Sequence, residues 1–146
     1  MSLHIEQRES EGIVILDLKG PLTLGHGDLD LRDTLHALHQ SGKVNMVLNL
    51  KDVSHIDSTG LGTLVFGLAR LRKAGGKLAL VNLNRSHLEL FSLTKLAIAF
   101  EFFDNEQEAV NSFFPDRAVK PFDILNFIQH KDDRNSELGV RSAETC

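Results

Sequence analysis

The chain has 146 residues, of which 42% are hydrophobic and 25% are charged, and its formal net charge is −4. This length and apolar content suit one globular domain with a short appendage. The acidic balance argues against a nucleic-acid-binding protein, whose surface usually carries a basic patch. The single cysteine, Cys146, excludes a disulfide framework or a cysteine-based zinc site within the chain and favours a reducing compartment.

Neither a membrane span nor an export signal is indicated. No apolar run reaches the roughly 18–20 residues that cross a bilayer. The first residues, "MSLHIEQRES", contain no basic region followed by an apolar one. We therefore expect a cytoplasmic protein with no membrane span and no resident cofactor.

Four elements are predicted in the first part of the chain. Alternating apolar residues in "GIVILDLKG" predict a strand bounded by Gly12 and by Gly20-Pro21, and the weaker "LHIEQRE" before it pairs as a hairpin turning at Gly12. Leucines at helical spacing predict a helix from Asp28 to Gln40, with Gly42 as a stop. "VNMVLNL" is the most apolar strand and is predicted to lie at the centre of the sheet.

The second part of the chain continues the alternation of helices and strands. Leu61, Leu64, Val65 and Leu68 predict one face of a helix from Thr59 to Ala74, ended by Gly75-Gly76. The following segments are a strand at 77–83, a helix at 85–96, an edge strand at 99–103 and a helix at 105–114 capped by Asp104 or Asn105.

This order of elements, ββαβαβαβα, predicts an α/β fold with a mixed, mostly parallel sheet and helices packed on it. We assign residues 1–115 to this domain and residues 116–146 to a C-terminal extension. Phe122, Leu125 and Ile128 predict a short helix at 121–130, packed on the domain or on a neighbouring copy as a homo-oligomer contact.

The stretch "DVSHIDSTGLGTLVFG", residues 52–67, carries the candidate chemistry. A serine hydrolase elbow needs Gly-x-Ser-x-Gly, but Ile56 stands where the first glycine should be. An aspartic protease motif would have one residue fewer between Asp57 and Gly60, and no phosphate-cradling Gly-x-x-x-x-Gly-Lys-Ser/Thr motif is present. The simplest interpretation is a helix N-cap, which favours Asp, Ser and Thr.

A helix cap alone does not explain the glycines that follow Ser58. Gly60 and Gly62 fall in the first helical turn, where each costs up to about 1 kcal/mol relative to alanine. We expect them to leave the helix N-terminus bare, so that a partner's backbone can approach. The free N–H groups there would also accept the charge of a phosphate on Ser58.

The stretches "VLNLKDVSHIDSTGLGTLVFGLARLRKAGGKLALVNL" and "LELFSLTKLAIAFEFFDNEQEAV" resemble a STAS domain of the kind found in anti-sigma factor antagonists. The likeness lies in the order and spacing of a strand, Ile-Asp-Ser-Thr-Gly-Leu-Gly, a helix, Gly-Gly and a further strand. It covers roughly Leu3 to Pro115. Thr23 departs from the pattern, because the family often has an acidic residue there, close to the phosphorylation site.

The resemblance implies a non-enzymatic phospho-switch that regulates sigma-factor-dependent transcription by partner switching. The family's phosphorylated serine corresponds to Ser58. The implied partner is an anti-sigma factor with serine-kinase activity, of the histidine-kinase-like ATPase type, and a serine phosphatase restores binding. The residues expected to contact that partner are Asp57, Thr59, Gly60, Gly62, Thr63 and Phe66.

Other interpretations stay open on the sequence alone. The chain could be an unphosphorylated STAS subunit of a stress-sensing or lipid-transport assembly. Phe66, together with Thr63 and Arg70, is predicted to point away from the core face of its helix, which favours an interface. His36 and His39 could both face a metal, but no third ligand is placed by the sequence, so we predict no metal site.

Overall fold

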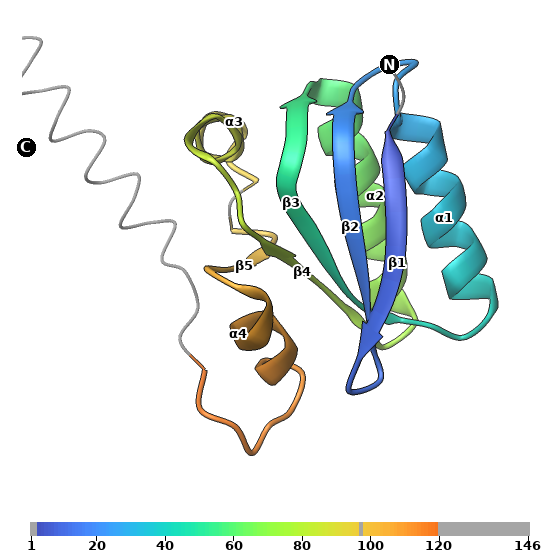
Figure 1. Cartoon of the computed structure of the whole chain (residues 1–146), viewed down its shortest axis with the longest axis vertical. Helices are drawn as coiled ribbons and strands as arrows, with labels where there is room; N and C mark the ends of the chain where they lie inside the picture. The colour runs from blue at the N-terminus through green and yellow to red at the C-terminus, as the bar shows by residue number, and fades with distance from the viewer. Residues whose placement is uncertain (1–2, 97, 120–146) are drawn as a thin grey trace, which may run out of the picture.

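The computed structural model describes residues 3–96 and 98–119, and the predicted helix at 121–130 lies outside this part of the chain. The nine predicted elements occur in the predicted order (Figure 1). The α/β fold and its mixed sheet are therefore confirmed. No helix of the described residues is both long and apolar enough to cross a membrane.

The first two strands form the antiparallel hairpin expected from the sequence. Strand β1 (His4–Ser10) pairs with β2 (Ile13–Leu22), and Glu11 and Gly12 form the turn with φ of 53° and 83°. The predicted end of the second strand was wrong, because β2 continues through Gly20-Pro21 to Leu22. Proline is tolerated there because the β1 ladder ends at Lys19 and the β3 ladder is irregular between Gly20 and Leu22, so its missing N–H interrupts no regular pairing.

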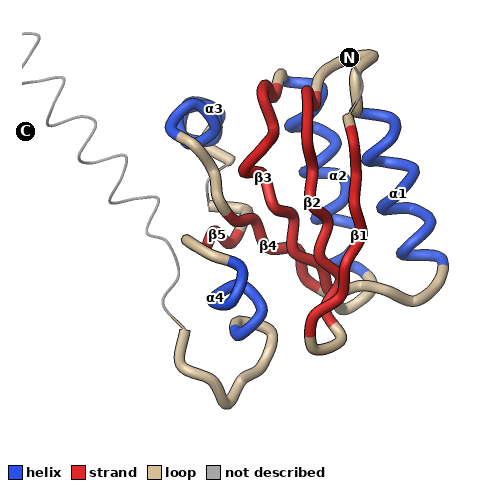
Figure 2. The backbone as a smooth tube through the Cα atoms, viewed as in Figure 1, coloured by secondary structure: helices blue, strands red, loops and turns tan. Residues whose placement is uncertain are grey.

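The sheet has five strands in the order β1-β2-β3-β4-β5 (Figure 2). Its other members are β3 (Asn45–Ile56), β4 (Lys77–Val81) and β5 (Glu101–Phe103). All neighbours except the β1–β2 pair run parallel, and β3 lies at the centre, as predicted. Parallel strands bring their carboxyl ends to one edge, so the segments after β2 and β3 meet there.

Helices cover both faces of this sheet unequally (Figure 1). Helices α1 (Asp28–Gln40) and α2 (Ser58–Lys73) lie on one face, over a core that includes Leu16, Leu48 and Leu64. On the other face, α4 (Glu106–Asn111) covers a smaller apolar cluster around Ile15 and Val47. Helix α3 (Arg85–Thr94) packs at the β4–β5 end, where Phe91 contacts Phe100 and Phe102 edge to face.

Helix α4 differs from its predicted bounds and is linked to the sheet by ion pairs. The cap of α4 is Asn105, whose side chain accepts the backbone N–H of Glu108, and the helix ends sooner than expected. On the sheet face that α4 leaves open, Arg8 of β1 joins Asp17 of β2 to Glu106 of α4. These polar contacts link α4 to the first two strands, on the face of the sheet opposite to α1 and α2.

Candidate functional site

The candidate site begins at Asp57, which ends the segment after β3 and caps α2. Its Oδ1 accepts the backbone N–H of Gly60 at 2.9 Å, and its Oδ2 accepts that of Leu24 at 3.0 Å. These N–H groups, Leu24 first and Gly60 next, hold the pKa of the Asp57 carboxyl below its usual range. Asp57 is therefore an ionised anchor that ties the β2–α1 loop to the start of α2.

Gly60 is required by packing inside the domain. A Cβ added at Gly60 would lie 1.9 Å from the backbone oxygen of Leu22, and the residue is buried. The expectation that this glycine leaves the helix bare for a partner is therefore wrong, because the end of β2 already occupies that space. Gly62 does match the expectation: it is exposed, and an added Cβ would meet nothing within 4 Å.

The hydroxyl residues of the motif differ in their exposure. Ser58, the first residue of α2, is exposed, and Thr59 is half-buried. Thr63 is only 8% exposed, and its Oγ1 donates to the carbonyl of Thr59 at 3.2 Å. The prediction that Thr63 faces outward was wrong, because Thr63 is buried and its hydroxyl is bonded within α2.

The structure adds to the site an apolar residue that the sequence analysis missed, Leu24, whose backbone N–H donates to Asp57. Thr23 and His26 exchange backbone hydrogen bonds of 2.9 Å, which places Leu24 in a tight turn between them. Leu24 is 69% exposed, and Leu29, in the first turn of α1, is 52% exposed. The available signal was an apolar residue inside a short polar and glycine-rich loop, where no strand or helix periodicity requires one.

Phe66 lies about two helical turns beyond Ser58 on α2. It is 46% exposed, so the predicted placement outside the core is confirmed. The guanidinium carbon of Arg70 stands 5.4 Å from the centre of the Phe66 ring, a cation–π arrangement.

Of the described residues, no group of three histidine, cysteine or acidic side chains is arranged to hold a metal ion.

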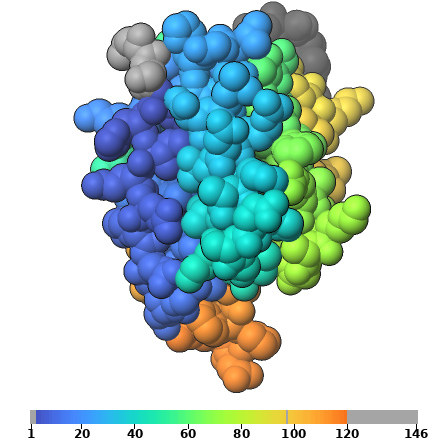
Figure 3. Space-filling model, turned by 90° about the vertical axis from the view of Figure 1, so that its right-hand side faces the viewer, coloured from blue at the N-terminus to red at the C-terminus, as the bar shows by residue number. Residues whose placement is uncertain are grey.

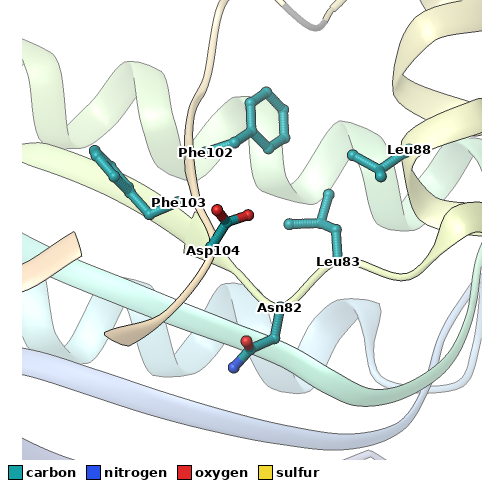
Figure 4. Close-up of a pocket in the computed structure, with 6 residues that line it drawn as sticks. All are labelled: Asn82, Leu83, Leu88, Phe102, Phe103 and Asp104. Carbon is teal, nitrogen blue, oxygen red and sulfur yellow. The ribbon is translucent and has the colours of Figure 1, made fainter. Parts of the chain in front are cut away.

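A small hollow lies at the carboxyl ends of β4 and β5, away from Ser58 (Figure 4). Its volume is about 60 Å³, and Leu83, Leu88 and Phe102 form its apolar side while Asn82 and Asp104 stand at its polar side. Ligand pockets usually measure about 300–1,000 Å³. This hollow is therefore a gap in the packing around α3 rather than a substrate site.

Comparisons with known proteins agree with this fold. A family model described as the STAS domain matches residues 4–109. The anti-sigma-B factor antagonist of Bacillus subtilis is 32% identical over 66% of this chain and 86% of its own length. The anti-sigma F factor antagonist of Paenibacillus polymyxa is 27% identical over 75% of this chain and 94% of its own length. A crystal structure assigned to an anti-sigma factor antagonist of Thermotoga maritima superposes with a TM-score of 0.70 at 28% identity, covering 74% of this chain and 92% of that one.

Proposed function

The chain belongs to the STAS domain family, and we propose that it acts as an anti-sigma factor antagonist whose binding is switched by phosphorylation of Ser58. Its relatives from Bacillus subtilis and Paenibacillus polymyxa are anti-sigma factor antagonists by name. The proposed partner is an anti-sigma factor that also carries serine-kinase activity, and a serine phosphatase reverses the modification. In this role the protein is a substrate and a binding module, not a catalyst.

The position of Ser58 is the observation that carries this proposal. The residue is exposed, stands at the first position of a sixteen-residue helix and follows an ionised N-cap. The sequence of α2 contains no acidic residue, and the neighbouring carboxylate of Asp57 is already bonded to the N–H groups of Gly60 and Leu24. A helix N-terminus offers N–H groups and a partial positive charge, so it accommodates a phosphate without rearrangement of the fold.

The same phosphate would disrupt a fitted partner surface. Exposed Leu24 is bonded through its N–H to the adjacent Asp57, and exposed Gly62 and Phe66 follow Ser58 along α2, a mixture of apolar and small residues suited to close contact. Phosphorylation adds about −1.5 to −2 charge to this surface. A partner surface that fits a neutral hydroxyl beside the Asp57 carboxylate would then face three strongly solvated oxygens and an added repulsion. Release therefore requires no change in the antagonist's own backbone.

The proposal is tested by incubating the chain with its anti-sigma factor partner and ATP, then locating phosphate by mass spectrometry. The matched control is Ser86, an exposed serine in the first turn of α3. We expect phosphate on Ser58, none in Ser58→Ala and unchanged modification in Ser86→Ala. Phosphate on Thr59 would move the site, and no phosphate on the wild-type chain would favour an unphosphorylated structural subunit.

A further inference from the structure

On the helical face, where α1 and α2 lie side by side (Figure 3), residues of both helices line a second feature. Two adjoining hollows share His39, Phe66 and Arg70 as wall residues, and the larger is an open trough of about 550 Å³. We call this surface the α1–α2 groove, and its polar and aromatic lining is Arg32, His36, His39, Phe66, Arg70 and Lys73.

The groove is cationic in a chain whose formal net charge is −4. Arg32, Arg70 and Lys73 line it, and no carboxylate does. None of these three cations forms an ion pair with another described residue, whereas Arg8 and Arg117 are both paired with carboxylates. The acidic residues of α1, Asp28, Asp30 and Asp33, do not line the groove. Three cations without an ion-pair partner among the described residues therefore line the same groove.

The groove also contains an exposed aromatic side chain, Phe66, on a helix that packs closely against α1. Phe66 is 46% exposed under the Arg70 guanidinium. An added Cβ at Gly67 would lie 2.7 Å from Cδ1 of Leu35, so α1 and α2 are in close contact below the ring. In the wall, Nδ1 of His39 is buried and has no hydrogen-bond partner among the described residues. Aromatic and arginine side chains held in this way are typical of energetically important contacts in interfaces.

We propose that the α1–α2 groove binds an acidic, amphipathic segment of a partner protein. An apolar side chain of that segment would cover Phe66, and its carboxylates would pair with Arg32, Arg70 and Lys73. That the segment belongs to the anti-sigma factor rests on the proposed function. Ser58 and Arg70 are about 18 Å apart along the axis of α2, because a helix rises about 1.5 Å per residue. A protein partner spans this distance, so the groove is a second point of attachment beside the phosphorylation site.

The inference is tested with a fluorescein-labelled synthetic peptide that carries glutamate on one helical face and leucine on the other. Fluorescence anisotropy measures its affinity, and amide chemical shifts of the full chain locate it. We expect shifts around Phe66, Arg70 and His39, and affinity that falls as salt is added. Arg70→Glu and Phe66→Ala should each weaken binding by on the order of tenfold or more, because buried charge and aromatic contacts dominate such sites.

The controls separate groove binding from general attraction. Lys51→Glu makes the same charge change at an exposed position of β3 that does not line the groove, and it should leave the affinity within about twofold of wild type. A peptide with glutamine in place of glutamate should bind much more weakly. Unchanged amide spectra outside the groove establish that each variant is folded.

Ser58→Asp separates this inference from the phospho-switch. The variant should bind the probe peptide as well as the wild type does, even where it no longer binds the anti-sigma factor. Equal loss with Lys51→Glu, shifts confined to another face, self-association through the groove or absence of binding would each overturn the groove proposal. Failure of Ser58 to become phosphorylated would overturn the proposed switch and leave the groove result standing.

Discussion

The first turns of α2 and α3 are built on the same cap but end differently. In each, a side chain at the N-cap accepts the backbone N–H three residues later: Asp57 from Gly60 and Asn84 from His87. In α3 that third residue is a buried histidine, whose Nδ1 accepts the N–H of Asn84 and whose Nε2 lies 3.1 Å from the carbonyl of Val53. In α2 it is a glycine pressed against the backbone of Leu22.

This difference separates a structural helix start from one suited to binding. The side chain of His87 occupies the space beside the first turn of α3 and bonds both to the N-cap residue and to β3, so no room is left there for a partner. The glycine of α2 leaves no side chain there, and the second oxygen of Asp57 is free to hold the β2–α1 loop through the Leu24 N–H. The α2 turn is therefore held by the Asp57 carboxylate and by close backbone contact with Leu22, while Ser58 and Gly62 stay exposed.

The largest expected effect on stability comes from adding a side chain at the first turn of α2, where α3 has one and α2 does not. Gly60→Ala would place a Cβ 1.9 Å from the Leu22 oxygen, so the helix or the strand end must move. We expect a loss of about 3 kcal/mol or more in the free energy of unfolding, measured by urea denaturation. Gly62→Ala, with nothing within 4 Å, should instead stabilise by about 0.5–1 kcal/mol. Equal effects at the two positions would contradict the structural role given to Gly60.

Removing the histidine that closes the α3 turn should have the next largest effect. His87→Ala leaves the Val53 carbonyl without this partner and opens a gap, at a loss of about 2 kcal/mol. His55→Ala, at an exposed position of β3, is the control and should change stability by less than about 0.5 kcal/mol.

The same histidine makes stability depend on pH. Burial lowers the pKa of folded His87 below its ordinary value of 6.5, so the unfolded chain takes up a proton at a higher pH than the folded chain. Stability should therefore fall as the pH drops below about 6.5. Urea titrations at neutral and mildly acidic pH measure this, and a wild-type slope that persists unchanged in His87→Ala would assign it to another group.

Removing the N-cap side chain of α2 should destabilise the fold less than His87→Ala does, because Asp57 is partly exposed and its removal leaves no buried gap. Asp57→Ala should lower the free energy of unfolding by about 1 kcal/mol. It should also release the β2–α1 loop, visible as faster amide exchange at Leu24 than in wild type. Because the pKa of folded Asp57 is lowered, its stabilisation is present above the unfolded value of about 3.9 and is lost as the pH falls below it. Protected exchange at Leu24 in the variant would show that other contacts hold the loop.

The sequence predicted the fold well because periodicity and glycine stops are local signals. The order of elements, the hairpin at Gly12 and the central place of β3 all follow from such signals. The end of β2 did not, since Pro21 is tolerated where β1 has stopped pairing and the β3 register is irregular. That is a fact about a neighbouring strand, which the local pattern does not contain.

The candidate site was predicted in part for the same reason. The exposure of Phe66 followed from helical phase, and the cap followed from residue type. The burial of Gly60 and Thr63 depends on how closely α2 approaches the end of β2 and its own domain. The contribution of Leu24 depends on a hydrogen bond to Asp57 across thirty-three positions of sequence. Contacts of this range become visible only when the strand ends are placed side by side.

The smallest expected change in stability is at Ser58, and it is paired with the largest expected change in binding. Ser58→Asp adds a negative charge in the first turn of α2, where it interacts favourably with the helix N-terminus by about 0.3–1 kcal/mol. The free energy of unfolding should therefore stay the same or rise slightly, in contrast to every α2 change above except Gly62→Ala. Affinity for the anti-sigma factor, measured by titration calorimetry, should nevertheless fall at least tenfold. Ser86→Asp places the same charge in the first turn of α3 and should leave that affinity unchanged. If both variants bound equally well, the exposed start of α2 would be no more a binding surface than the closed start of α3, and the functional side of the comparison would fail.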